Sequence, residues 1–144
     1  MDRLAEILQK RSPVVHPLGP EATVLEAVAV MADQGVGAIP VVDHGKLVGI
    51  FSERDVLRRV LALGRAPERT PLGDVMTRDP VTASGAESRL GAIVKMQAAG
   101  CRHLPIVVDG LVIDMLSIRD LLFHEIAARD AEIDALKKYI HGNY

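Results

Sequence analysis

Apolar and polar positions follow a helical rhythm early in the chain and a strand rhythm soon after it. Apolar residues recur at steps of three and four between Val24 and Met31, and polar residues lie among them. Thr23 followed by Glu26 has the spacing of a capping box, and Gly35 suits a helix stop. The pattern therefore predicts a helix that begins after Thr23 and ends at Gly35.

Two short β-branched runs follow this helix. They are IPVVD, residues 39–43, and LVGIFS, residues 47–52, and turn residues at 43–45 join them. Such runs predict a β-hairpin. Helical spacing returns from Glu53 to Leu63, and the pair at 14–15 adds a short strand before the first helix. The predicted unit is therefore strand, helix, strand, strand, helix.

This unit occurs twice. A shift of 65 residues aligns the two halves of the chain without a gap from Ala22 to Leu57. Chance similarity does not keep one register for so long, so the chain contains two copies of one supersecondary unit. The identical pairs that the shift aligns include Leu25 and Leu90, Met31 and Met96, Gly35 and Gly100, Pro40 and Pro105, Ser52 and Ser117, Arg54 and Arg119, and Asp55 and Asp120.

The second copy predicts the same elements as the first. Its strand at 81–82 and its helix from about Arg89 to Ala99 precede a hairpin and a final helix that begins at Ile118. The runs HLPIVV and LVIDMLS form the predicted hairpin. The cap of the first helix is weaker in the second copy than in the first, because Gly91 occupies the place of Glu26 and lowers helix propensity by about 1 kcal/mol relative to alanine.

The order of elements predicts an α+β fold in which the sheets of the two repeats pack together with pseudo-two-fold symmetry. Residues 1–69 hold an N-terminal helix and the first repeat, and residues 70–144 hold the second repeat with an extended C-terminal helix. The link RAPERTPLGD contains two prolines and mixed charge, which predicts an exposed connector. Neither half is expected to close a core alone, and clefts are expected between related elements.

The C-terminal segment extends the last helix beyond the repeat. Its apolar positions alternate steps of four and three, like the a and d positions of a coiled coil, and one arginine interrupts them. Either this helix lies on its own repeat, or it contacts the same helix of a second chain, aided by the N-terminal helix around Leu4, Ile7 and Leu8. The positions are Leu122, Ile126, Arg129, Ile133, Leu136 and Ile140.

Composition narrows the class of protein. Apolar residues make up 49% and charged residues 25% of the 144, as in ordinary globular proteins that bury a core. A net charge of −2 and an aromatic content of 3% argue against nucleic-acid and membrane-surface partners. The chain shows no signal-peptide run and no membrane-spanning stretch, and its single cysteine fits a reducing compartment, so a cytoplasmic location is expected.

The residue types do not form the patterns expected of an enzyme. The histidines, at 16, 44, 103, 124 and 141, lack metal-ligand spacing, and no Ser-His-Asp or Cys-His arrangement stands out. Cys101 neighbours Arg102, a charge of the kind that lowers thiol pKa values, but it aligns with Val36 and suits a small apolar packing role better. We therefore expect neither catalysis nor a metal.

Two motifs, each present twice, carry a resemblance to a known family. They are GVGAIPVV with GCRHLPIV, and IFSERD with MLSIRD. With them the chain resembles the tandem cystathionine-beta-synthase (CBS) domain pair, or Bateman module, from Val14 to about Ile126, and in particular the stand-alone pairs. The resemblance implies a homodimeric, disc-like sensor that binds an adenosine-containing ligand between the repeats, without catalysis, and regulates an unknown protein partner. The implied ligands are AMP first, then ATP or ADP, NAD(H) and S-adenosylmethionine.

The Ser-x-x-Asp motif permits two interpretations. Ser52 with Asp55, and Ser117 with Asp120, have the spacing of capping boxes, and from these residues alone a cap is the simpler interpretation. The same spacing also presents the carboxylate one turn into the helix, where it can accept two hydrogen bonds from a ribose diol. The resemblance implies that Asp55 and Asp120 are the ribose ligands.

A phosphate in such a site requires cations, because an aspartate in the first helical turn offsets the attraction of the helix N-terminus for anions. The candidates are Arg54 and Arg119 beside the aspartates, and Arg102 with His103 before a strand. For the last two, a solvated strand entry is the simple alternative. The first copy has glycine and alanine, at 37 and 38, where the second has Arg102 and His103, so we expect unequal clefts.

The resemblance also places a base beside the inner strands. Ile39 with Pro40, and Leu104 with Pro105, begin these strands, and core packing is the simpler interpretation of each residue alone. Val15 and Thr82 complete the residues assigned to nucleotide binding. An aspartate at 114 replaces the glycine at 49 and is expected to crowd or re-charge the second cleft. The alternative function is a protein-interaction scaffold with vestigial clefts.

Overall fold

The computed structural model describes residues 2–142, so the ends of the ranges above at residues 1, 143 and 144 lie outside it. Its elements repeat at the interval found in the sequence. Each bound in the second repeat lies 65 residues after its counterpart in the first, which confirms the two predicted copies. The first set is α2 (Val24–Gln34), β1 (Ala38–Asp43) and β2 (Lys46–Ser52), and the second is α5 (Arg89–Ala99), β4 (His103–Val108) and β5 (Leu111–Ser117).

The predicted caps and turns account for these bounds. Thr23 and Glu26 form the full capping box of α2, whereas Ser88 alone caps α5 by accepting from the Gly91 N–H at 2.9 Å. Both helices end at a glycine in the left-handed region. Both hairpins turn through two residues of positive φ, His44–Gly45 and Asp109–Gly110, as tight antiparallel hairpins require.

The last helix of each repeat begins where the sequence predicts but continues differently. In the first repeat a single α-helical turn, α3 (Glu53–Asp55), passes into a π-helix, η1 (Val56–Leu61). In the second repeat the helix is one long element, α6 (Ile118–Gly142). Within residues 2–142, every helix is too short or too polar to cross a membrane.

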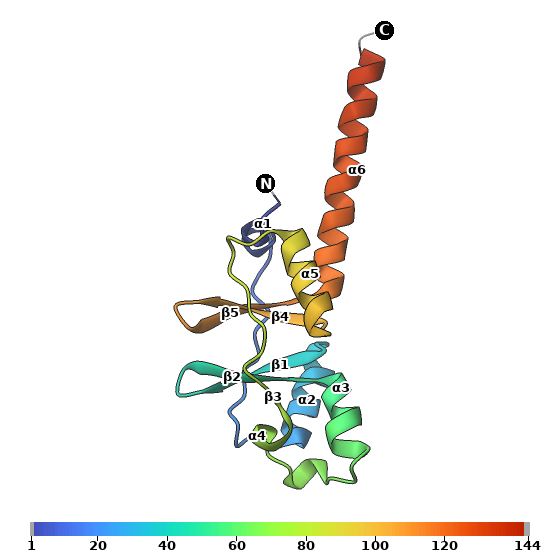
Figure 1. Ribbon diagram of the computed structural model, residues 1–144. Helices are drawn as coiled ribbons and strands as arrows, with labels where there is room; N and C mark the ends of the chain where they lie inside the picture. Colours follow the sequence, from blue (N-terminus) through green and yellow to red (C-terminus); the bar gives the residue numbers. More distant parts are fainter. Residues whose placement is uncertain (1, 143–144) are drawn as a thin grey trace.

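The predicted strands at 14–15 and 81–82 do not form. Instead, a residue that follows each of these pairs makes a single parallel bridge, Leu18 to Val41 and Ala83 to Ile106. Prolines at 13, 17, 20 and 80 remove backbone donors from these segments, which limits them to such short pairings. The two hairpins lie one above the other, with β2 against β5, so the sheets of the repeats pack together as predicted (Figure 1).

The link between the repeats, residues 65–74, is only in part the exposed connector that its composition predicts: Arg65, Glu68 and Arg69 are exposed, but its second half is anchored in the core. It contains η2 (Pro67–Arg69) and the start of α4 (Leu72–Val75), and β3 (Thr77–Arg78) follows it and pairs with β2. Leu72 is 0% and Val75 is 3% exposed. The two apolar residues at helical spacing outweigh the polar surroundings, because burying each removes a large side chain from water.

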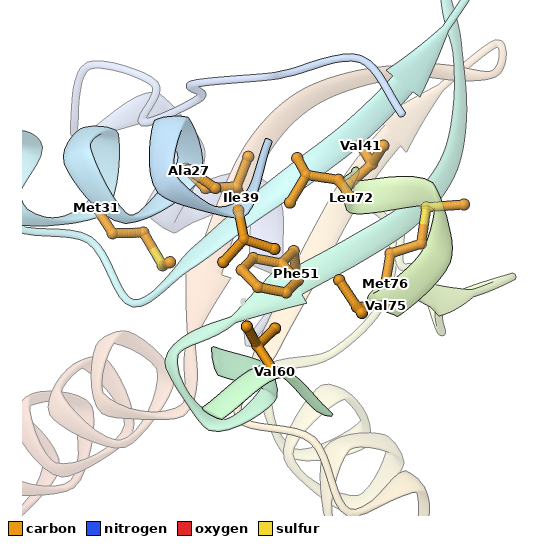
Figure 2. Packing of buried hydrophobic residues seen from close by; sticks show 10 residues of the cluster. Ala27, Met31, Ile39, Val41, Phe51, Val60, Leu72, Val75 and Met76 are labelled. Carbon is orange, nitrogen blue, oxygen red and sulfur yellow. The ribbon is translucent and has the colours of Figure 1, made fainter. Parts of the chain in front are cut away.

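Two hydrophobic clusters form the core, one in each repeat, and each is completed by a helix from outside that repeat. The first cluster joins α2, β1 and β2 to α4, as Figure 2 shows around Phe51. The second joins α5, β4 and β5 to α1 (Leu4–Gln9), which buries Leu4 and Ile7. The helix that precedes each repeat thus packs on the other repeat, and Ile7 and Leu72 occupy equivalent places 65 residues apart.

This exchange corrects the role suggested for the N-terminal helix in a dimer. Leu4 and Ile7 are 0% and 1% exposed, and Leu8 packs against the same cluster. A buried arginine holds the helix in place: Arg89 is 5% exposed and forms ion pairs with Asp2, Glu6 and Glu125 at 3.2, 3.3 and 3.1 Å. Arg89 therefore joins α1 to the start of α6.

The distal half of α6 projects beyond the body of the molecule (Figure 1). Leu121 anchors its start and is 0% exposed, whereas every residue from Arg129 to His141 is exposed. Of the two alternatives for this segment, a helix lying on its own repeat is therefore wrong beyond Arg129.

Gly49 supports the packing of α4 and provides a test of it. A Cβ atom at Gly49 would lie 2.5 Å from Met76 Sδ and 2.9 Å from the Thr77 carbonyl oxygen. We expect Gly49→Ala to lower the free energy of unfolding by about 1–3 kcal/mol, as overpacked sites do. The measurement is urea unfolding followed by circular dichroism. Gly85→Ala is the matched control, because its Cβ would meet Ala5 Cβ at an ordinary 3.5 Å; equal losses in both variants would contradict the packing described.

Candidate functional site

Two clefts lie at equivalent places between the repeats. The Asp120 cleft has a volume of about 1050 Å³ and is lined by residues 34–38 of the first repeat and 117–120 of the second. The Asp55 cleft has a volume of about 460 Å³ and is lined by residues 99–103 and 52–55. The two linings match at the 65-residue interval, so the clefts are pseudo-symmetric.

Both Ser-x-x-Asp motifs form capping boxes at a cleft wall. The Ser52 N–H donates to Asp55 Oδ2 at 2.9 Å, and the Asp55 N–H donates to Ser52 Oγ at 3.4 Å. The corresponding distances at Ser117 and Asp120 are 3.0 and 3.1 Å. The capping interpretation is therefore confirmed in both copies. The cap also fixes each carboxylate at the first turn of its helix, where it lines the cleft.

Arg102 and His103 lie at the boundary of the clefts and line both of them. The alignment of the two repeats predicts that these two side chains belong to one cleft only, and the structure corrects that prediction. The reason is Gly37: a Cβ there would lie 2.6 Å from Glu53 Oε1 and 3.0 Å from His103 Nε2. The missing side chain lets His103 reach across from the second repeat. Arg54 lines only the Asp55 cleft, and Arg119 only the Asp120 cleft.

The imidazole of His103 has a pKa below its ordinary value. Burial lowers its pKa, Glu53 and Asp120 act in the opposite direction, and the charge of Arg102 lowers it further. An anion that enters beside His103 adds to the effect of the two carboxylates and raises the pKa again. The pKa of His103 is therefore sensitive to the charges placed beside it.

Arg11 is the main cleft residue that sequence reasoning missed. Its guanidinium donates to Asp114 Oδ1 at 2.6 Å, to the Met115 carbonyl oxygen at 2.9 Å and to Asp120 Oδ2 at 3.4 Å. It also lines the Asp120 cleft. The available signal was Asp114 itself, because a carboxylate inside an apolar strand requires a buried partner.

Asp114 does not crowd the second cleft as expected. It is 2% exposed, lines neither cleft, and accepts from Arg11 and from the Val14 N–H at 3.0 Å. The 65-residue interval aligns Asp114 with Gly49 and Arg11 with Met76. At one of the two pseudo-symmetric positions Gly49 lies against Met76, and at the other Asp114 lies against Arg11. Of these two pairs, only the second brings a charge to a cleft.

Asp55 also has an arginine neighbour, but from its own helix. Arg59 Nε lies 3.5 Å from Asp55 Oδ1, and Arg59 Nη1 donates to the Met76 carbonyl oxygen at 2.9 Å. Arg58 and Arg59 both line the Asp55 cleft and were not among the predicted site residues. Asp55 and Asp120 are therefore each paired with a guanidinium, although the two arginines come from unrelated positions.

Several predicted site residues do not reach a cleft. Ile39 and Leu104 are fully buried in the two clusters, and Pro40 and Pro105 are buried beside them in β1 and β4. Val15 and Thr82 lie next to lining residues without lining a cleft themselves. The residues that do line the clefts in these segments are Val14, His16, Pro80 and Val81.

Cys101 lines the Asp55 cleft but is not an activated thiol. Burial raises the pKa of Cys101, against smaller opposing effects of backbone hydrogen bonds and of Arg54. The side chain packs against the second cluster, in keeping with the apolar role predicted for it. Among the residues that the structure describes, no group of three or more His, Cys, Asp or Glu side chains is placed to hold a metal ion.

The family model of the CBS domain matches the chain twice, at residues 4–62 and 72–126. The chain belongs to the CBS domain family. It is 35% identical over 127 residues to the mitochondrial CBS domain-containing protein CBSX3 of Arabidopsis thaliana, covering 85% of this chain and 62% of that protein. It is 33% identical to the CBS domain-containing protein YhcV of Bacillus subtilis, covering 90% of this chain and 91% of that one.

Solved CBS structures share the fold. The crystal structure of the CBS domain NE2398 has a TM-score of 0.81 at 32% identity and covers 86% of this chain and 97% of its own. The CBS domain protein PAE2072 from Pyrobaculum aerophilum, complexed with AMP, has a TM-score of 0.72 at 29% identity and covers 82% and 88%. The predicted fold class, two CBS repeats with helical extensions at both ends, is confirmed.

The Arg11–Asp114 pair can be tested by converting it into its pseudo-symmetric counterpart. Arg11→Met alone leaves a buried carboxylate without its cation, so we expect the free energy of unfolding to fall by about 2–4 kcal/mol. Adding Asp114→Gly recreates the Met76–Gly49 arrangement and should restore at least about 1 kcal/mol of that loss. The measurement is urea unfolding of the two single variants and the double variant.

The control for this cycle is Arg69→Met, because the Arg69 side chain is 82% exposed and its contact with Glu68 lies at the surface. That variant should change the unfolding free energy by no more than about 0.5 kcal/mol. A double variant whose loss equals the sum of the two single losses would show that Arg11 and Asp114 are not coupled.

Proposed function

We propose that this protein is a regulatory module that binds an adenosine-containing ligand in the clefts between its CBS repeats, without catalysis. The observation that carries the proposal is the pair of equivalent clefts, each with a capped aspartate beside a guanidinium. CBS structures are known in complex with AMP, as in PAE2072, which supports the same ligand class for this chain.

A capped aspartate suits a ribose diol. The cap holds the carboxylate in one orientation through the N–H of Ser52 or Ser117. A carboxylate that is already ordered binds two hydroxyl groups at a smaller entropic cost than a free side chain does. Asp120, whose side chain is 34% exposed, is more accessible than Asp55 at 12%. We therefore assign the first ribose site to Asp120 and the second to Asp55.

The cations around the Asp120 cleft suit a phosphate group. Arg11, Arg102 and Arg119 line it together with His103, and the acidic residues beside them are Glu53 and Asp120. Arginine binds phosphate through paired hydrogen bonds and keeps its charge at any physiological pH. Because Arg11 already contacts Asp120, a bound nucleotide would find two groups side by side: a carboxylate that accepts hydrogen bonds from the ribose and a guanidinium that donates them to the phosphate. AMP is our first candidate.

The walls of the Asp120 cleft suit the base. They include aliphatic side chains from both repeats, namely Val14, Val28, Met31, Val36 and Met115. Adenine between such side chains is held by dispersion and by the removal of apolar surface from water. Stacking on aromatic rings is not required.

Regulation follows if the ligand prefers one of two states of the protein. Differential binding of about 1–3 kcal/mol shifts such an equilibrium by one or two orders of magnitude. We expect a homodimer in the cytoplasm, the reducing compartment that suits Cys101, and a separate protein that responds to the shift. The alternative function is an interaction scaffold whose clefts bind nothing.

Mass spectrometry of the denatured, purified protein and a thermal-shift panel separate these functions. Ligand at one hundred times its dissociation constant adds about 2.7 kcal/mol of stability, which raises the melting temperature by several degrees. The panel contains AMP, ADP, ATP, NAD, NADH and S-adenosylmethionine, and chromatography of the incubated ligand tests for turnover. A chain with no copurified nucleotide and no shift would leave the scaffold as the function.

Amide substitution distinguishes the proposed role of the two aspartates in ligand binding from their role as helix caps. Asp120→Asn and Asp55→Asn keep an acceptor for the serine N–H but lose the charge, so we expect each to weaken AMP binding in its own cleft by at least about tenfold. The measurement is isothermal titration calorimetry. Glu26→Gln is the matched control, since Glu26 belongs to the capping box of α2 and lines neither cleft. If both aspartate variants bind AMP as the unaltered chain does, the aspartates are caps only.

Binding of AMP should take up protons through His103. The pKa of His103 lies below its ordinary value of about 6.5 in the free protein, and a phosphate beside it raises the pKa. Between the two values the bound protein holds more protons, so affinity rises as the pH falls through this window. Calorimetry in two buffers of different ionisation enthalpy measures the uptake. His103→Gln should reduce it; the same uptake in both proteins would place the phosphate away from His103.

A further inference from the structure

The projecting half of α6 carries an apolar stripe that the repeat itself does not need. In the first repeat the corresponding helix ends at Leu61, whereas α6 continues to Gly142 (Figure 1). The residues from Arg129 to His141 are all exposed and so contribute little to the core of their own chain. Their apolar side chains are therefore available to a surface outside the chain.

The spacing of the stripe identifies the kind of surface. Isoleucine recurs every seven residues at Ile126, Ile133 and Ile140, and leucine stands four residues before the first and last of these, at Leu122 and Leu136. The five side chains are between 44% and 61% exposed. Isoleucine at the a position with leucine at d is the pattern of parallel, two-stranded coiled coils.

We propose that α6 pairs with α6 of a second copy of this chain, parallel and in register. The flanking charges favour this orientation. In a parallel pair Glu132, at position g, meets Lys137 of the second copy, at position e. An antiparallel pair would place g against g and so bring Glu125 or Glu132 towards another g residue instead of a lysine.

The charged residue in the stripe fits the same pairing. Arg129 occupies a d position, and its Nε already lies 3.5 Å from Glu125 of its own helix. In the parallel pair, Glu125 faces Asp130 of the second copy, and Arg129 lies beside these two carboxylates as their counter-charge. A single polar residue in the seam lowers stability but specifies the register and the number of strands.

The stripe continues onto the body of the molecule. The 65-residue interval aligns Leu122 and Ile126 with Leu57 and Leu61 of η1, which are 63% and 53% exposed. Figure 1 shows α3 and the start of α6 along the same edge of the molecule. A two-fold axis beside α6 therefore passes both repeats, and it places the first repeat of one copy beside the first repeat of the other.

Cysteine cross-linking tests the orientation. In the full chain with Cys101→Ser, Leu122→Cys and Leu136→Cys are made separately; these two d positions lie about 21 Å apart along the helix at 1.5 Å per residue. In-register parallel pairing predicts that both variants form disulfide-linked dimers on mild oxidation. An antiparallel pair brings at most one of these positions to its own counterpart. Lys138→Cys, on the outer face of the same turns, is the matched control and should not cross-link.

Dimer affinity tests the stripe itself. Ile133→Asp should raise the dimer dissociation constant by at least about tenfold, whereas Ala131→Asp puts the same charge on the outer face and should leave it unchanged. Sedimentation equilibrium without ligand gives both values, so the outcome does not depend on AMP binding. The pairing is overturned if the unaltered chain stays at its monomer mass of 15.5 kDa at micromolar concentration, if the two aspartate variants behave alike, or if only one of the leucine positions cross-links.

Discussion

The reciprocal burial of two short helices is the contact on which the other features depend. Ile7 of α1 lies in the cluster of the second repeat, and Leu72 of α4 lies in that of the first. Each helix leads into a segment that crosses to its own repeat, and these segments supply cleft residues such as Val14 and Val81. Hydrophobic burial at the ends of the molecule thus positions the walls of the clefts in its middle.

The same place in the two repeats is filled by different chemistry. Met76 packs against Gly49, and Arg11 pairs with Asp114. The desolvation of a buried ion pair offsets much of its attraction, so the Arg11–Asp114 pair is not expected to stabilise the fold more than the Met76–Gly49 pair does. It differs in what it presents to the cleft, because the guanidinium of Arg11 reaches Asp120 as well as Asp114. The guanidinium of Arg11 in the Asp120 cleft therefore originates in this substitution of one packed pair by another.

Local interactions were predicted well, and the reasons are physical. The features predicted correctly are both Ser-x-x-Asp caps, both hairpin turns and the glycine stops. Each depends on residues within four positions of one another, so a short stretch of sequence is enough to predict its geometry. Apart from the strands expected at 14–15 and 81–82, the incorrect predictions concern contacts between distant segments. The link around Leu72 was taken for solvent-exposed chain, and Ile39 was assigned to a ligand although it packs in a core.

By itself the sequence determined that there are two copies of one unit, where their helices and hairpins begin, and which carboxylates stand at the helix starts. The tertiary structure decided which repeat each preceding helix joins, that His103 lines both clefts, and that Arg11 pairs with an aspartate 103 residues away. The physical reason is that the apolar face of a short helix can pack equally well on either of two similar cores, so its sequence pattern does not show which one it joins. Only chain connectivity and packing in three dimensions select one of them.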